Sequence, residues 1–343
     1  MDIPAPLRTS VEQGNVVLML GSGASMASKS DAGASPPSAG GLASLLADRF
    51  LNANYRSHPL SQVADFAISE SSLFEVQSFI REIFLPFRPS AAHLLLPTFR
   101  WRAIFTTNYD VLTEDAFSAV PNRAQELVPL FKNVNRWDGI LSDSDKVALF
   151  KLHGCIHDTH DIHCPLILST ENYIDFRTGR DRLFRQFQEL AAERTFLFVG
   201  YSLNDPNIRS LLRDLDREQV GRPRSYMVSN SVDEISSRYW SSRLITTIQG
   251  TFQDLMAELD RSTGIFRAYR KSTPAGVTAI AERFAVAGYE LAPATLKSME
   301  LDIEYVKSIT TDSACDPRRF YAGVSQDWAP IQHDFDVRRK LTD

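Results

Sequence analysis

Short apolar runs alternate with stretches of helical periodicity along most of this chain. The apolar runs cover residues 16–20, 101–107, 147–152, 195–199, 225–228 and 244–248, and a shorter one at 166–168 is predicted as an edge strand. Runs that are apolar throughout are typical of strands buried on both faces of a parallel sheet. Helical spacing fills several of the intervals, at 183–192, 207–215 and 252–259. The pattern predicts an α/β fold with a Rossmann-like, doubly wound parallel sheet.

Two regions interrupt or follow this alternation. Helical spacing from Leu42 to Phe87 predicts a helical layer inserted at about 42–100, preceded at 27–41 by a Ser/Pro/Gly-rich stretch that we expect to be a mobile loop. Helical spacing returns at 277–287 and 294–309, and the tail from Cys315 is aromatic-rich and ends in charged residues. We therefore predict a domain over residues 1–265 and a helical C-terminal extension and linker over 266–343, leading toward a further module.

Composition narrows the class of protein. The chain has 343 residues, a net charge of -5 and 23% charged residues. It therefore lacks the excess positive charge that binding to nucleic acid or to a membrane surface requires. The chain has three cysteines, a small and odd number that does not fit a disulfide scaffold. The N-terminus has no secretory signal, and no run is long enough to span a bilayer. We expect a cytoplasmic protein.

Polar and glycine residues follow the strands at the points where the apolar runs end. They are Gly21, Ser22, Gly23, Ala24 and Ser25 after the first run, Thr107, Asn108 and Asp110 after the second, His153 after the third, Gly200 and Ser202 after the fourth, and Asn230 after the fifth. The carboxyl ends of parallel strands meet at one edge of a sheet, where doubly wound folds bind their ligands. We expect these residues to form one ligand site.

Each residue type has a chemical use and a plainer alternative. A glycine turn lets backbone N–H groups approach a pyrophosphate, although small-residue turns are also common without any ligand. Asn108 can position a ribose hydroxyl or a water, and His153 can accept a proton near neutral pH. Asp110 and Asp205 are alternatively helix caps.

A cluster of metal-ligand residues needs separate consideration. It consists of Cys155, His157, His160, His163 and Cys164. Thiolate and imidazole suit zinc, but this spacing matches no familiar zinc pattern. We expect no metal.

Four segments in order, GSGAS, TTNYD, KLHG and VGYSLNDPNI, resemble the sirtuin-like superfamily, and in particular its NAD-degrading branch in bacterial anti-phage defence systems. The resemblance runs over roughly residues 14–262. It implies that NAD binds as the substrate and that its nicotinamide–ribose bond is hydrolysed. It assigns NAD contacts to Gly21, Gly23, Ala24, Gly200 and Ser202. It assigns catalysis to Asn108 and His153.

The departures from the superfamily pattern are also informative. Protein-deacylating sirtuins carry two Cys-x-x-Cys pairs and an Asp-Phe-Arg after the glycine turn, and this chain has neither. We therefore favour an NAD hydrolase over a deacylase, with a non-catalytic NAD- or ADP-ribose-binding module as the alternative. Residues 321–339 resemble the linker to a STAND-type NTPase sensor. The resemblance implies a homo-oligomer, restrained until a sensor module or a phage-derived trigger activates it.

Overall fold

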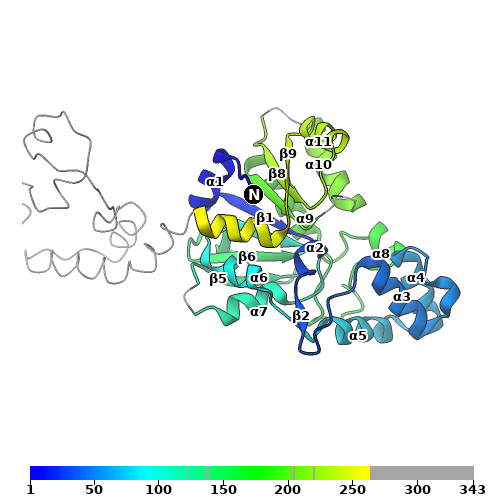
Figure 1. The fold of residues 1–343 in the computed structure, drawn as a ribbon. Helices are drawn as coiled ribbons and strands as arrows, with labels where there is room; N and C mark the ends of the chain where they lie inside the picture. The colour runs from blue at the N-terminus through cyan, green and yellow to red at the C-terminus, as the bar shows by residue number, and fades with distance from the viewer. Residues whose placement is uncertain are drawn as a thin grey trace, which may run out of the picture. The chain divides into compact units, whose positions relative to one another are not determined.

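The centre of the fold is a seven-stranded sheet in which every neighbouring pair is parallel (Figure 1). The computed structural model describes residues 1–262 apart from 122, 136, 138, 202, 204 and 219–220. The strands are β1 (Val16–Leu20), β4 (Ala103–Thr106), β5 (Glu126–Leu130), β6 (Lys146–Lys151), β7 (Thr195–Val199), β8 (Ser225–Ser229) and β9 (Ile245–Gln249). Their spatial order is β5-β6-β4-β1-β7-β8-β9, which confirms the predicted doubly wound α/β fold.

Two apolar layers cover the two faces of the sheet, as continuous apolar strands require. On one face Phe105 and Phe196 pack against α9 (Asp181–Glu193) and α10 (Pro206–Glu218). On the other face Leu18 and Leu197 pack against α1 (Ala5–Glu12), α7 (Leu112–Ala119) and the helical residues 252–262. Successive residues of each strand therefore contribute to opposite layers.

The predicted helical insertion is confirmed as a third apolar cluster beside the sheet (Figure 1). It contains α3 (Ala39–Phe50), α4 (Leu60–Glu70) and α5 (Leu73–Phe84). The shorter elements are α2 (Ser22–Ser25), β2 (Lys29–Ser30), η1 (Ala53–Tyr55), β3 (Phe87–Arg88), α6 (Ala91–Leu95), η2 (Leu96–Thr98), η3 (Ile140–Ser142), α8 (Thr170–Ile174) and α11 (Glu234–Ser241). Strands β2 and β3 pair with each other, outside the main sheet.

One strand prediction was wrong, and one strand was not predicted. Residues 166–168 form no strand, because the Leu166 N–H donates to the Gln77 side chain (2.7 Å), and Leu166 and Leu168 are buried in the helical-layer cluster. Strand β5 was missed because it is mostly half-exposed and contains Pro129, which an edge strand tolerates.

The chain's contacts separate Met1–Gly264 from the rest of the chain, and only residues of this first unit are described. The predicted helices at 277–287 and 294–309 and the linker-like tail lie outside the described residues.

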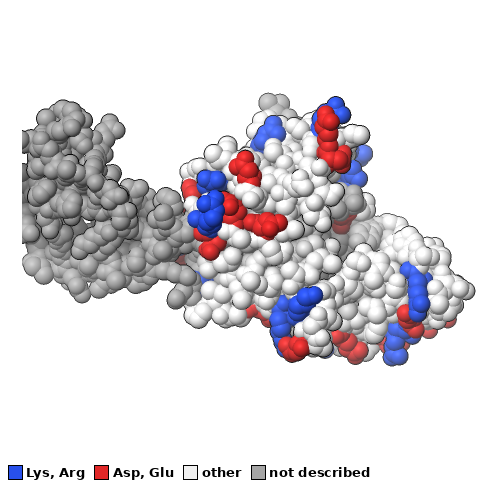
Figure 2. Space-filling model, in the orientation of Figure 1, with Lys and Arg blue, Asp and Glu red and all other residues white. Residues whose placement is uncertain are grey.

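Charged side chains of both signs are interspersed on the face of the molecule drawn in Figure 2. Among the described residues, no helix combines the length and the apolar character that crossing a bilayer requires.

Two glycine turns meet at the point where the sheet reverses its winding. Leu20 and Val199 are partners in the β1–β7 register, so Gly21 and Gly200 follow them side by side. A Cβ on Gly21 would lie 2.7 Å from Tyr201 Cα, and one on Gly23 would lie 2.8 Å from Gly200 Cα. Gly200 also has a φ of 60°, a backbone conformation that residues with a Cβ adopt only at a cost in free energy. Only glycine allows these two backbones to touch.

We predict that Gly200→Ala destabilises the fold by about 3 kcal/mol or more, because a left-handed φ and overlap with the Gly23 and Ala24 backbone add together. Gly33→Ala is the matched control, since Gly33 has a φ of 80° with nothing within 4 Å. It should cost about 1 kcal/mol from backbone strain alone. Denaturant unfolding followed by circular dichroism measures the free energy of unfolding of both variants. Equal losses would show that the contact of Gly200 with Gly23 and Ala24 adds nothing to stability.

Candidate functional site

Four neighbouring strands, β6, β4, β1 and β7, end at one cavity of about 350 Å³. The loop at 36–38, the helical layer, α8 and the start of α10 complete its wall. Its lining residues are Ser22, Ser25, Pro36, Pro37, Ser38, Ala39, Leu42, Leu60, Phe84, Thr107, Asn108, Tyr109, Asp110, His153, Tyr173, Gly200, Tyr201, Asp205 and Pro206. The cavity therefore lies at the carboxyl edge of the sheet, beside its topological switch point.

The structure places the residues singled out in the sequence in three groups. Ser22, Ser25, Thr107, Asn108, Asp110, His153 and Gly200 line the cavity. Gly21, Gly23 and Ala24 are not lining residues and form the turn beside it. Asn230 is exposed after β8 and lies outside the lining, and Ser202 lies outside the described residues.

The Asn108 side chain is fixed by the glycine turn. Its Nδ2 donates to Gly21 O (3.0 Å) and to Ser25 Oγ (3.1 Å). Ser25 Oγ in turn donates to Asp110 Oδ2 at 2.8 Å. Because the Gly21 carbonyl can only accept, Nδ2 must face the turn, and the amide oxygen is the group that Asn108 can offer to a ligand.

A buried network of charged groups contacts the Asp110 end of this chain of hydrogen bonds. Lys151 is fully buried and donates to the Asp110 carbonyl and to Glu114 Oε1 (2.8 Å). Burial lowers the pKa of Lys151, but Glu114, Cys155 and Asp110 raise it more, so its pKa lies above the ordinary value. Burial raises the pKa of Asp110, and the Lys151 ammonium opposes that rise. Lys151 thus keeps its charge and holds the β4–α7 connection.

His153 is buried and lies against a carboxylate. Its Nε2 is 3.0 Å from Asp205 Oδ2, and its ring meets Tyr173 edge-to-face at 5.5 Å. Nε2 makes no hydrogen bond of good geometry to any described residue, so the contact with Asp205 is a close approach of an imidazole nitrogen to a carboxylate oxygen. Burial raises the pKa of Asp205, but His153 and the Ile208 and Asn207 N–H groups lower it below its ordinary value.

The glycine turn differs from an open nest of amides. Its Gly21, Gly23 and Ala24 N–H groups donate to Val199 O (3.0 Å), Gly200 O (2.8 Å) and Gly21 O (2.9 Å). The N–H groups that we expected to hold a pyrophosphate are therefore used within the protein. The Ser22 and Ser25 side of the turn remains to contact a ligand, because these two residues line the cavity.

Several lining residues were missed by sequence reasoning. Asp205 was interpreted only as a helix cap, and its Oδ1 does accept from Asn207 N (2.9 Å) and Ile208 N (3.1 Å). Its other oxygen contacts His153, which no local pattern could indicate. Tyr109, Tyr201 and Pro206 stand in the segments after β4 and β7 but were not singled out. The other missed lining residues, from the 36–42 segment, α4, α5 and α8, come from regions without strand-end signals.

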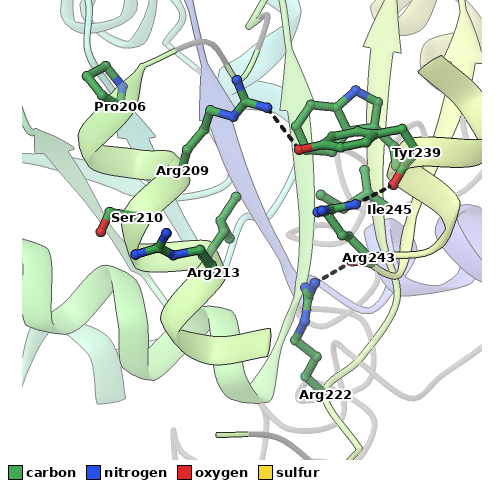
Figure 3. Close-up of a pocket in the computed structure, with 10 residues that line it drawn as sticks. Pro206, Arg209, Ser210, Arg213, Arg222, Tyr239, Arg243 and Ile245 are labelled. Carbon is green, nitrogen blue, oxygen red and sulfur yellow. Dashed lines mark hydrogen bonds between the residues drawn. The ribbon is translucent and has the colours of Figure 1, made fainter. Parts of the chain in front are cut away.

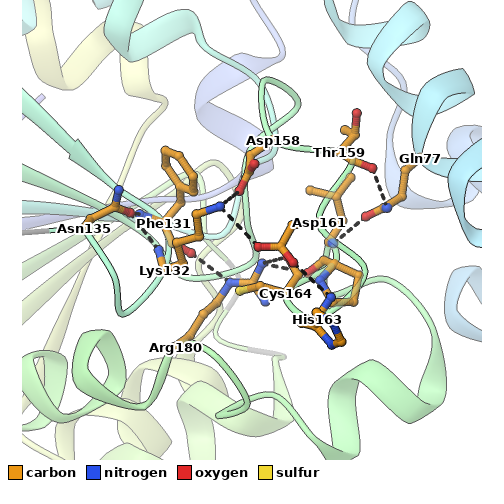
Figure 4. Close-up of polar contacts among 12 residues, drawn as sticks. Gln77, Phe131, Lys132, Asn135, Asp158, Thr159, Asp161, His163, Cys164 and Arg180 are labelled. Carbon is orange, nitrogen blue, oxygen red and sulfur yellow. Dashed lines mark hydrogen bonds and ion pairs between the residues drawn. The ribbon is translucent and has the colours of Figure 1, made fainter.

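Three sets of polar contacts fix the loop that follows His153 after β6 (Figure 4). Lys132 Nζ bridges Asp158 (2.8 Å) and Asp161 (3.2 Å), and Arg180 donates to Pro165 O at 2.7 Å. Gln77 of α5 donates to Thr159 O (2.9 Å) and accepts from Leu166 N (2.7 Å). These bonds tie the loop to the sheet and to the helical layer.

The cysteine and histidine cluster of this loop is not assembled for a metal. Cys155 and Cys164 are buried free thiols, whereas His157, His160 and His163 are exposed. Across the described part of the chain, no three His, Cys, Asp or Glu side chains converge on a common point.

Taken together, the cavity offers an amide oxygen, a buried imidazole–carboxylate pair and several hydroxyls. An imidazole that accepts a proton becomes a cation, which the adjacent Asp205 carboxylate stabilises. Such a set suits hydrogen bonding to sugar hydroxyls and transfer of one proton.

Part of the chain resembles a known domain family. Residues 102–248 match the SIR2-like domain family. The chain is also a distant relative of the NAD(+) hydrolase ThsA of Enterococcus faecium, with 26% identity over 127 residues. That match covers 37% of this chain and spans only 25% of the length of ThsA.

Solved structures were compared as well. A Sir2 homologue mutant in complex with ADP-ribose covers 76% of this chain and 96% of its own, at 12% identity and a TM-score of 0.46. A Sir2 homologue–NAD complex covers 78% of this chain and 96% of its own, at 15% identity and a TM-score of 0.44.

We predict that Asp205→Asn lowers the free energy of unfolding by about 1–3 kcal/mol at neutral pH, because a charged partner of buried His153 is lost. The pKa of Asp205 is lowered on folding, so its contribution is present above the ordinary aspartate pKa of about 4 and disappears as the pH falls. The difference between wild type and variant should therefore shrink toward pH 3. Thermal unfolding across pH measures it.

Asp233→Asn serves as the control. Asp233 also caps a helix, accepting from Ser236 N at 2.9 Å, but it is exposed and pairs with no histidine in the described residues. Its loss should be smaller than that of Asp205→Asn. Equal losses for the two variants would show that capping alone explains Asp205.

Proposed function

We propose that this chain is an NAD hydrolase that cleaves the nicotinamide–ribose bond to give nicotinamide and ADP-ribose. The single observation that carries the proposal is that Asn108 and His153, from separate strand ends, line one cavity. The match of residues 102–248 to the SIR2-like domain family and the distant relation to ThsA support the same substrate.

The cavity dimensions and chemistry fit part of the dinucleotide. A volume of about 350 Å³ is at the small end of the usual range for ligand sites, which suits the nicotinamide–ribose half. Asn108 Oδ1 would accept from a ribose hydroxyl or orient the attacking water. The pyrophosphate would extend along Ser22 and Ser25, which line the cavity beside the glycine turn.

The proposed reaction needs one bond to break and one proton to move. The C–N bond leaves its electron pair on the nicotinamide nitrogen, which becomes neutral, and the ribose becomes an oxocarbenium ion. Water then adds to the anomeric carbon and His153 accepts its proton. Asp205 would stabilise the resulting imidazolium, which makes Asp205 a positioning residue for the base.

We also propose that this activity is the effector function of an anti-phage defence system. An enzyme that depletes NAD must be silent at rest. Oligomerisation or a sensor module would then release it, so the activity has to be measured together with the proteins that the neighbouring genes encode. Members of the family that deacylate proteins differ by the motifs absent from this chain.

Asn108→Ala and His153→Ala should each reduce nicotinamide release from NAD by about 10²-fold or more, because one orients the reacting groups and the other accepts the proton. The measurement is product analysis by mass spectrometry on the activated protein. His163→Ala is the control, because His163 is exposed on the same loop and lies outside the cavity lining.

Wild-type rates in Asn108→Ala and His153→Ala would refute the assignment. Tight NAD or ADP-ribose binding without nicotinamide release by activated wild type would instead support a regulatory binding module. Release of acetyl groups from an acetylated peptide would support a deacylase.

A further inference from the structure

A second cavity, of about 360 Å³, lies between α10 and α11 (Figure 3). Arg209 and Arg213 of α10 form one side, and Arg243 lies on the other side, just after α11. Arg222 completes a set of four lining arginines. Among the described residues that line this cavity, none is acidic and only Pro206 also lines the candidate NAD cavity.

Neutral groups hold the guanidinium groups of Arg209 and Arg243 in place. Arg209 Nη2 donates to the Tyr239 hydroxyl at 2.9 Å. The Arg243 guanidinium lies 3.9 Å from the Tyr239 ring centroid and donates to Tyr239 O at 3.1 Å. Arg222 is buried and donates to the Arg243 carbonyl. An aromatic face and carbonyl oxygens orient a guanidinium without cancelling its net charge.

Arg213 adds a charge that is not compensated locally. It is exposed and makes no hydrogen bond or ion pair to any residue in the described part of the chain. The positive charges of Arg209, Arg213 and Arg243 around one cavity repel one another, so a polyvalent anion between them would be strongly attracted. The guanidinium fork also matches two phosphate oxygens at once.

The rest of the lining favours more than a simple ion. Trp240, Leu212 and Ile245 provide aromatic and aliphatic surface in the same cavity. Its volume falls within the range of small-molecule sites, well beyond the needs of one phosphate ion. A ligand that combines several negative charges with a flat apolar ring satisfies both parts of the lining.

We propose that the cavity between α10 and α11 binds the di- or triphosphate group of a nucleotide, with the base against Trp240. This site is distinct from the proposed NAD cavity. Its occupancy requires neither Asn108 nor His153.

The test is calorimetric titration of ATP into the full chain, with inorganic tripolyphosphate as a second probe. Wild type should bind ATP, and the double variant Arg209→Gln with Arg213→Gln should bind it at least 10-fold more weakly. Arg238→Gln is the matched control, because Arg238 is an exposed arginine of α11 outside the lining. Its ATP affinity should equal that of wild type.

A second arm separates the two cavities. The double variant Asn108→Ala with His153→Ala should keep wild-type ATP affinity, and loss of binding there would assign ATP to the NAD cavity and overturn the proposal. Absence of ATP binding by wild type, or unchanged binding after Arg209→Gln with Arg213→Gln, would also overturn it. Tripolyphosphate binding as tightly as ATP would exclude a role for the base. Capture of an acidic peptide but not ATP would assign the cavity to a protein partner.

Discussion

Direct backbone contact between two glycine turns is the constraint on which this structure depends. Gly21 and Gly23 touch Gly200 so closely that no Cβ fits at any of the three positions. The contact joins the ends of β1 and β7, the two central strands on either side of the winding reversal. The carbonyl of Gly21, which lies in this contact, accepts a hydrogen bond from Asn108 Nδ2 and so fixes the orientation of the Asn108 side chain. Fold geometry and side-chain orientation are thereby linked through one backbone contact.

Charge burial completes the site. Lys151 is enclosed with Glu114 and the Asp110 carbonyl, and Asp205 is enclosed with His153. Removing either partner of a buried pair leaves a charge without compensation, which costs far more than the pair contributes. Each pair joins the end of β6 to a helix, through Glu114 of α7 in one case and Asp205 before α10 in the other.

Most of the central sheet could be predicted because its inner strands are largely apolar and are followed by glycine or polar residues. The strand ends also revealed Asn108, His153 and Gly200, since parallel strands bring their carboxyl ends together. Asp205 as the partner of His153 was not predictable, because that pairing depends on how α10 meets β6, and a helix cap explained the residue locally. The half-exposed β5 and the cavity wall formed by residues 36–38 have no periodic signal in the sequence. The hydrogen bonds that the N–H groups of the glycine turn donate depend on its contact with Gly200, which the sequence does not show.

The most direct test of the central claim is a crystal structure of the His153→Ala protein with NAD bound. We expect the nicotinamide ribose in the cavity lined by Asn108 and Tyr173, with a ribose hydroxyl within about 3.2 Å of Asn108 Oδ1. NAD bound elsewhere on the molecule, or with its ribose out of reach of Asn108, would contradict the account.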